Sequence, residues 1–116
     1  MLITKTSPLS VALTVKTISA TLQQAGITVF ATIDHAKNAR DVGLELRDAV
    51  LLIFGNPKVG TLLMQEQPIM GIDLPMRMLI WQDENQETKI TYLDPVKLAE
   101  QYNLKQNQEL LQKYKE

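Results

Sequence analysis

Ala49–Phe54 is the longest continuous apolar run in the chain, and it constrains the fold more than any other segment. Six residues are too few for an ordinary helix, and no alternation marks one face as polar. Such a run is typical of a strand that is buried on both faces and lies inside a sheet. Gly55 then breaks the strand, Asn56 can cap a helix, and Pro57 suits its first position. The sequence therefore predicts a strand that leads directly into a helix.

Helical spacing also marks the segment from Val11 to Ala25, where Ser10, or alternatively Ser7, is the expected cap and Gly26 the left-handed end. Asp94-Pro95 predicts a third capped helix to about Tyr102. The expected strands are Leu2–Lys5, Ile27–Ile33, Leu44–Arg47, Ala49–Phe54, Met76–Gln82 and Thr88–Leu93. In Ile27–Ile33 the alternation predicts one aliphatic face. Short helices are expected at Ala36–Val42 and from Asn56 to Gln65.

The predicted order is β-α-β-(α)-β-β-α-β-β-α-(α), with the last two predicted strands forming a hairpin around the turn Asp83–Glu87. Because strands occur in adjacent pairs, the order favours an α+β fold with an antiparallel or mixed sheet and helices on one face. The length of 116 residues fits one domain, with its core at about 2–102 and a tail helix at about 105–116. The segment Gln67–Pro75 is expected to be a loop.

Composition excludes several classes of function. The chain has no cysteine, which removes disulfides, thiolate nucleophiles and cysteine-bound metals. Its net charge of -1 gives no field that would attract nucleic acid or an anionic membrane. No signal peptide or bilayer-length apolar run is visible, so a cytoplasmic location is expected. No cofactor and no metal site are predicted.

Several short motifs occur in a fixed order along the chain. They are Ile33-Asp34-His35, Phe54-Gly55-Asn56-Pro57, Leu63-Met64, Ile72-Asp73-Leu74-Pro75-Met76-Arg77, Tyr92 and Asp94-Pro95. From about Ser10 to Tyr102 the chain resembles the domain of unknown function 302 family, a small bacterial and archaeal α+β domain of the TT1751-like superfamily. The resemblance implies the fold and, for some members, a dimer. It implies no established reaction.

Gly55-Asn56-Pro57 is the first candidate site. A glycine after a buried strand allows close approach of a ligand, and a helix start with free N–H groups favours a phosphate or carboxylate. The alternative is a strand-to-helix turn with a satisfied Asn56 cap, which we favour.

His35, the only histidine, is a candidate general base, proton carrier or single metal ligand. Asp34 stands beside it, and the alternative is a histidine that bonds to loop backbone. Asp73 and Arg77 form the third candidate, in which Arg77 holds an anion or, as we favour, pairs with a carboxylate. Methionines at 64, 70, 76 and 78 suit Cu(I) but more often fill a core.

Three hypotheses follow. The first is a non-catalytic module, homodimeric, that binds a small anionic or polar ligand among Asp34, His35, Gly55, Asn56, Pro57, Asp73 and Arg77, because these polar motifs follow strand ends. The second is an enzyme with His35 as acid or base and Arg77 as anion holder. The third is a structural or interaction module. The first two require His35, Asn56 and Arg77 to lie together.

Overall fold

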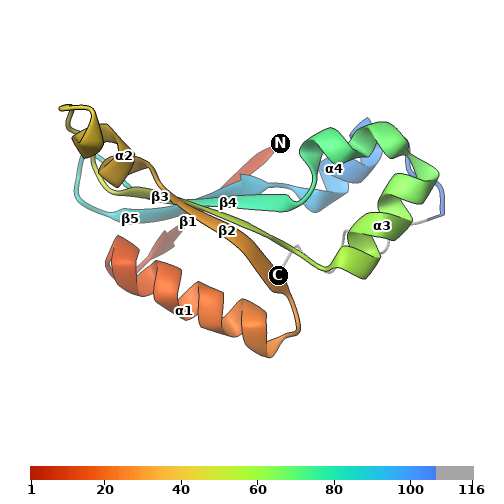
Figure 1. Ribbon diagram of the computed structural model, residues 1–116, viewed down its shortest axis with the longest axis horizontal. Coiled ribbons are helices and arrows are strands. Elements are labelled where there is room, and N and C mark those ends of the chain that lie inside the picture. Colours follow the sequence, from red (N-terminus) through yellow and green to blue (C-terminus); the bar gives the residue numbers. More distant parts are fainter. Residues whose placement is uncertain (107–116) are drawn as a thin grey trace.

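A five-stranded sheet forms the centre of the computed structural model, which describes residues 1–106 (Figure 1). Its strands are β1 (Leu2–Ser7), β2 (Thr28–Asp34), β3 (Ala49–Gly55), β4 (Met76–Gln82) and β5 (Thr88–Leu93). They lie in the order β1-β5-β4-β3-β2, and each neighbouring pair is antiparallel. The predicted α+β fold with an antiparallel sheet is confirmed, and β3 is an interior strand as its apolar run predicts.

The helices after Ser10, Asn56 and Asp94 begin where these cap residues predict, whereas the helix expected at Ala36 begins at His35. The helices are α1 (Val11–Gln24), α2 (His35–Asp41), α3 (Pro57–Glu66), the 3-10 helix η1 (Pro68–Asp73) and α4 (Pro95–Gln101). The residue before each of the four α-helices caps it: its side-chain oxygen accepts a hydrogen bond from a backbone N–H of the first turn. These cap residues are Ser10, Asp34, Asn56 and Asp94. Gly26 adopts a φ of 76° just after α1, so the left-handed end that the sequence predicts is also confirmed.

The main core lies on one face of the sheet, which we call the covered face. Figure 1 shows α1 along this side of the sheet, while α3, η1 and α4 gather at one end. Buried strand residues of this face include Leu52, Phe54, Met76 and Ile80, and they pack with apolar residues of α1, α3 and α4. Burial of this apolar surface is the main term that holds the helices to the sheet.

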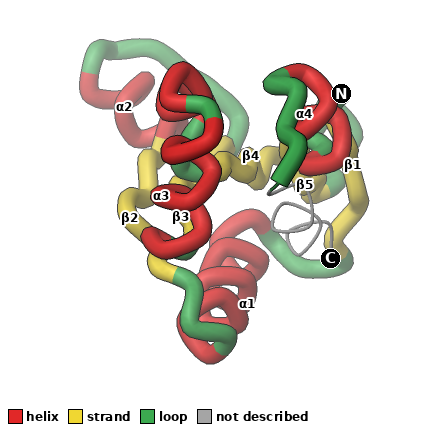
Figure 2. Tube along the Cα trace, turned by 90° about the vertical axis from the view of Figure 1, so that its right-hand side faces the viewer, coloured by secondary structure: helices red, strands yellow, loops and turns green. Residues whose placement is uncertain are grey.

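The opposite side of the sheet, which we call the open face, also carries apolar residues. Cross-strand partners place Ala31 beside Ile53, Ile33 beside Leu51, Leu51 beside Leu79, and Ala49 beside Trp81. Side chains of the open face are therefore Ala31, Ile33, Ala49, Leu51, Ile53, Leu79 and Trp81. The helices do not all share one face, because α2 lies across one end of this side, opposite α1 (Figures 1 and 2).

A β-bulge explains why the aliphatic residues of β2 do not share one face as predicted. The register shifts between Val29 and Ala31, so Val29 lies opposite Phe54 while Ala31 lies opposite Ile53. Because one extra residue reverses the alternation of side chains, Val29 packs on the core and Ala31 and Ile33 turn to the open face.

The strand that period-two alternation predicts at Leu44–Arg47 does not form. These residues are exposed, and the ladder of β3 begins only near Asp48, whose carbonyl accepts the N–H of Gln82 at 2.9 Å. The strands on either side of β3, β2 and β4, both end beside the start of β3. The preceding segment Leu44–Arg47 therefore has no neighbouring strand with which to pair.

Two further differences concern loops and the tail. Gln67–Pro75 is not a plain loop, since it contains η1. The tail helix predicted at about 105–116 falls almost wholly outside the described residues. None of the helices within residues 1–106 is both long enough and apolar enough to cross a membrane.

Candidate functional site

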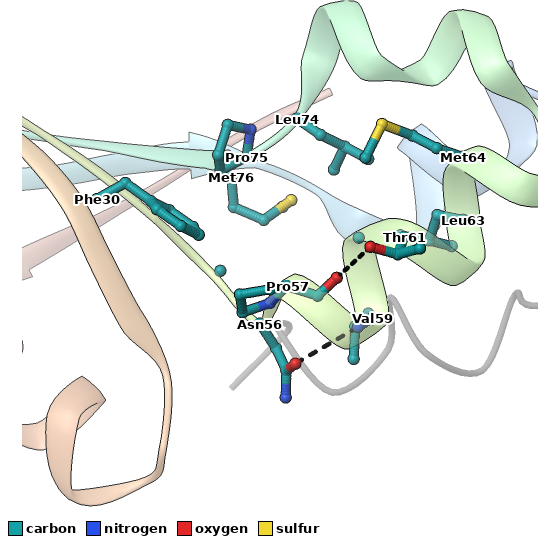
Figure 3. Close-up of a pocket in the computed structure, with 12 residues that line it drawn as sticks. Phe30, Asn56, Pro57, Val59, Thr61, Leu63, Met64, Leu74, Pro75 and Met76 are labelled. Atoms are coloured by element: carbon teal, nitrogen blue, oxygen red, sulfur yellow. Dashed lines mark hydrogen bonds between the residues drawn. The ribbon is translucent and has the colours of Figure 1, made fainter.

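A cavity of about 230 Å³ lies where β3 passes into α3 (Figure 3). Phe30 of β2 forms one wall, α3 another, and the segment from Leu74 to Met76 a third. The complete lining is Phe30, Gly55, Asn56, Pro57, Val59, Gly60, Thr61, Leu63, Met64, Leu74, Pro75 and Met76. This lining contains aromatic, aliphatic and thioether groups and no side chain that titrates near neutral pH.

Gly55, Asn56 and Pro57 all line this cavity. A Cβ added to Gly55 would lie 3.7 Å from the Phe30 ring and from the Pro75 side chain, which is ordinary van der Waals contact. Glycine is therefore not enforced here by a clash. Its effect is to leave open the space between Phe30 and Pro75.

The start of α3 is saturated with internal hydrogen bonds. The Asn56 Oδ1 atom accepts the N–H of Lys58 at 2.9 Å and the N–H of Val59 at 3.4 Å. The N–H of Gly60 donates to the Asn56 carbonyl at 2.9 Å, and Pro57 has no N–H. An anion would have to displace the Asn56 side chain to reach these donors, so the alternative that we favour, a satisfied cap, describes this junction.

Asp73 and Arg77 lie next to the cavity but do not line it. The Arg77 Nη2 atom is 3.4 Å from the Asp73 Oδ1 atom, which confirms the predicted pairing. The Tyr102 hydroxyl donates a short hydrogen bond to the other Asp73 oxygen, and this bond links η1 to the end of α4. The hydrogen bond to Asp73 raises the pKa of the Tyr102 hydroxyl, and burial and the Asp73 charge act in the same direction.

The structure does not bring His35 to the other candidates. Asp34 lies opposite Val50 at the start of β3, whereas Thr28 lies opposite Gly55 at its end. Six residue steps of strand, about 20 Å, therefore separate Asp34 from Thr28, the partner of Gly55. Asp34 accepts the N–H of Lys37 at 2.9 Å as the cap of α2, and His35 is exposed.

The expectation of one shared pocket was wrong for a topological reason. Polar motifs at the ends of consecutive strands meet only when those strands are parallel; in an antiparallel pair, the two ends lie at opposite edges. The enzyme hypothesis depended on convergence of His35 with Arg77, so the geometry removes its basis. Within residues 1–106, no three side chains of the His, Asp or Glu type gather as metal ligands would.

The sequence argument missed most of the cavity wall. Phe30 is not among the predicted site residues, and the methionines are expected to fill the core, although Met64 is 37% exposed and lines the cavity. The density of methionines near this segment was the available signal, because these flexible side chains commonly line adaptable apolar surfaces.

Comparison with known proteins identifies similar chains. Two "Fluoride-specific ion channel FluC 1" proteins, from Brucella suis biovar 1 and Brucella abortus biovar 1, are each 41% identical over 103 residues. The match covers 89% of this chain, and the chain spans only about two-fifths of these relatives, 41% and 38% of their lengths.

A solved structure has the same fold. It is the crystal structure of the "uncharacterized conserved protein DUF302" from Bacillus stearothermophilus. The two chains superpose with a TM-score of 0.85 and are 22% identical in sequence. The match covers 98% of this chain and 89% of the other. The family model "Domain of unknown function DUF302" matches residues 3–116. The chain therefore belongs to the DUF302 family, as the motifs from Ile33 to Pro95 indicate.

Proposed function

We propose that this chain is a non-catalytic binding module whose ligand is small and mainly apolar and occupies the cavity beside α3. The observation that carries the proposal is the lining of that cavity. Binding sites for small molecules are concave and largely apolar, with a few polar groups that orient the ligand. The absence of a titratable side chain from this lining favours binding over acid–base chemistry.

The proposed ligand class departs from the anionic or polar ligand that the motifs predict. Two polar side chains line the cavity, and both are engaged with α3. The Thr61 hydroxyl donates to the Pro57 carbonyl at 2.7 Å, and Asn56 caps the helix. Figure 3 shows the Asn56 amide turned toward the start of α3, away from Phe30 and Met76. Recognition would therefore rest on shape and apolar contact.

Cavity size limits the ligand. An apolar cavity of about 150 Å³ accepts benzene, so about 230 Å³ suits an aromatic or branched aliphatic molecule of about ten heavy atoms. At about 0.5 kcal/mol per atom, such a ligand would bind with about 5 kcal/mol, a Kd of roughly 0.2 mM.

Gly60 offers a direct test. Gly60 lines the cavity, and a Cβ on it would meet no atom within 4 Å, so we expect the side chain of Gly60→Leu to fit without a clash and to occupy part of the cavity. We expect small aromatic probes such as indole to raise the melting temperature of the wild type and of Gln65→Leu, but not of Gly60→Leu. Gln65→Leu is the matched control, because Gln65 is exposed on the same helix and does not line the cavity.

The same screen separates the ligand classes. His35→Ala should respond to indole as the wild type does, because His35 lies at the far end of β2. Phosphate, acetate and fluoride should give no shift that depends on Gly60. An anion that stabilises the wild type, with no response to apolar probes, would contradict the proposed ligand class.

The Brucella relatives favour a second, compatible role. Their printed name is that of a fluoride-specific ion channel, and a channel needs membrane-spanning segments of about 20 apolar residues per helix. No helix within residues 1–106 meets that requirement, and about three-fifths of each relative lies outside the match. We propose that the matched part is an accessory module beside a pore. Fluoride efflux by a Brucella relative carrying the equivalent of Gly60→Leu would test this, and unchanged efflux would count against it.

A further inference from the structure

We infer that Met64 of α3 sets the largest ligand that the cavity beside α3 accepts, and that Gly71 of η1 leaves the room in which the Met64 side chain lies. This inference rests on the proposed binding function and deepens it, because it names the two residues that decide ligand size. Both act through shape alone, so neither a charge nor a reaction is required of them.

Met64 lies at the open side of the cavity. The inner wall is formed by residues such as Leu63 and Met76, which are 1% and 4% exposed, whereas Met64 lines the same cavity and is 37% exposed. Figure 3 shows the Met64 side chain extending from α3 toward Leu74, which precedes β4. A side chain that lines the cavity and also faces solvent borders the way by which a ligand enters.

Met64 is also the exposed cavity residue of α3 that can change its shape. Pro57, Thr61 and Met64 are the exposed lining residues of this helix, and their spacings of four and three place them along one side of it. Pro57 is a rigid ring, and the Thr61 hydroxyl is bonded to the Pro57 carbonyl at 2.7 Å. Methionine is unbranched and has several rotatable bonds, so its thioether adapts to the space around it. The position of this thioether therefore decides how far a ligand can extend.

Gly71 leaves room for the Met64 thioether. A Cβ added to Gly71 would lie 3.2 Å from the Met64 Sδ atom and 3.9 Å from its Cγ atom. The first distance is tighter than ordinary van der Waals contact, so any larger residue at this position would have to displace the sulfur. Gly71 is not among the glycines with positive φ, so its backbone conformation does not require glycine. Its contribution is the space that it leaves to Met64.

The 3-10 helix η1 is held in place by contacts that do not involve Met64. Met70 of this helix is fully buried and belongs to the core cluster. At the end of η1, Asp73 pairs with Arg77 of β4 and accepts the Tyr102 hydroxyl at the end of α4. A group added to η1 would therefore move the flexible Met64 side chain before it moved η1.

Two substitutions should change the size limit in opposite directions. Gly71 does not line the cavity whereas Met64 does, so the thioether lies between them, and the methyl group of Gly71→Ala should push it toward the cavity. This variant should accept only shorter ligands than the wild type does. Met64→Ala removes the thioether and should accept longer ligands. The double variant should behave as Met64→Ala does, because its added methyl group has no thioether to displace.

A series of para-alkylphenols from 4-methylphenol to 4-butylphenol measures the size limit. These neutral probes differ only in chain length, and the concentration dependence of the melting temperature gives their dissociation constants. The readout is the ratio of the 4-butylphenol constant to the 4-methylphenol constant on one variant, in which a change of overall stability cancels. Each additional buried methylene improves affinity about fourfold. We therefore expect this ratio to fall roughly tenfold or more in Met64→Ala and to rise about fourfold in Gly71→Ala.

Two neighbouring substitutions are matched controls. Gln65 is exposed beside Met64 on α3, and Ile72 is 80% exposed beside Gly71 on η1, and neither residue lines the cavity. Gln65→Ala and Ile72→Ala change the same two helices without touching the cavity wall. Both variants should keep the wild-type ratio of dissociation constants.

Oxidation of the wild type adds a measurement that needs no substitution. Hydrogen peroxide converts an accessible methionine thioether to the sulfoxide, and mass spectrometry of peptides locates the added oxygen. Met64 should be oxidised faster than the buried Met70, and saturating indole should slow oxidation of Met64 severalfold while leaving Met70 unchanged.

Three results would overturn the inference and leave the proposed binding function in place, provided that the probes still bind the wild type and not Gly60→Leu. The first is a wild-type ratio in Met64→Ala. The second is a double variant that discriminates as Gly71→Ala does, which would show that the added methyl group acts without Met64. The third is oxidation of Met64 at the same rate with and without indole. Failure of every probe to bind the wild type would instead refute the binding function and this inference together.

Discussion

Replacement of Gly60 by alanine tests the local structure around the cavity most directly. Gly60 is the fourth residue of α3, and its backbone is not among those with positive φ. A Cβ at this position would meet no atom within 4 Å, so the new methyl group causes no clash. Alanine is favoured over glycine inside a helix by about 1 kcal/mol because the unfolded chain loses less conformational freedom.

We therefore expect Gly60→Ala to increase the free energy of unfolding by about 1 kcal/mol and the melting temperature by roughly 4 °C for a chain of this size. Urea unfolding followed by circular dichroism measures the first quantity, and a thermal scan measures the second. The slope of the urea transition should not change, because the variant exposes the same surface on unfolding.

Gly26→Ala is the control for this prediction. Its Cβ would also meet no atom within 4 Å, but Gly26 has a φ of 76°, which costs an L-residue about 1–2 kcal/mol. The two variants differ in backbone conformation and not in available space. If Gly60→Ala were as unstable as Gly26→Ala, the space beside Gly60 would be filled or α3 would not be a continuous helix, and the cavity would lose its support.

Two further predictions concern the ends of the same region. Asn56→Ala removes the oxygen that caps α3 and should lower the free energy of unfolding by about 1 kcal/mol, whereas Asn56→Asp keeps an acceptor and should stay close to the wild type; equal urea midpoints for all three would contradict the cap. Because the pKa of the Tyr102 hydroxyl is raised, the folded chain holds the hydroxyl proton more tightly than the unfolded chain does. The contribution of this hydroxyl to the free energy of unfolding is therefore complete below the usual pKa of 10.0 and is lost as pH rises above it. Stability measured from neutral to alkaline pH should therefore fall more steeply in the wild type than in Tyr102→Phe, and parallel curves would show that the bond to Asp73 makes no such contribution.

The cavity and the open face of the sheet lie on different parts of the molecule. The cavity lies at the end of the sheet where α3 begins, and the apolar residues of the open face lie on β2, β3 and β4. A ligand beside Phe30 would thus contact the strand that also carries Ala31 and Ile33 to the open face. The bulge between Val29 and Ala31 is the physical link between them, since it sends neighbouring residues of β2 to different surfaces.

Local features of the sequence determined where the elements begin and end. Ser10, Asn56 and Asp94 cap helices because a short side-chain oxygen can reach the free N–H groups of the first turn, which depends on neighbouring residues alone. The hairpin around Asp83–Glu87 and the interior position of Ala49–Phe54 are likewise readable from turn residues and apolar content.

Only the tertiary structure decided which of these elements meet. The antiparallel pairing of β2 with β3 places His35 and Asn56 at opposite edges of the sheet, and no local signal specifies that direction. Leu44–Arg47 has the alternation of a strand but lacks a neighbour, and the bulge at Phe30 reverses faces that a simple period would assign. Strand pairing joins residues far apart in sequence, so the cavity beside α3 and the open face exist only once the sheet is assembled.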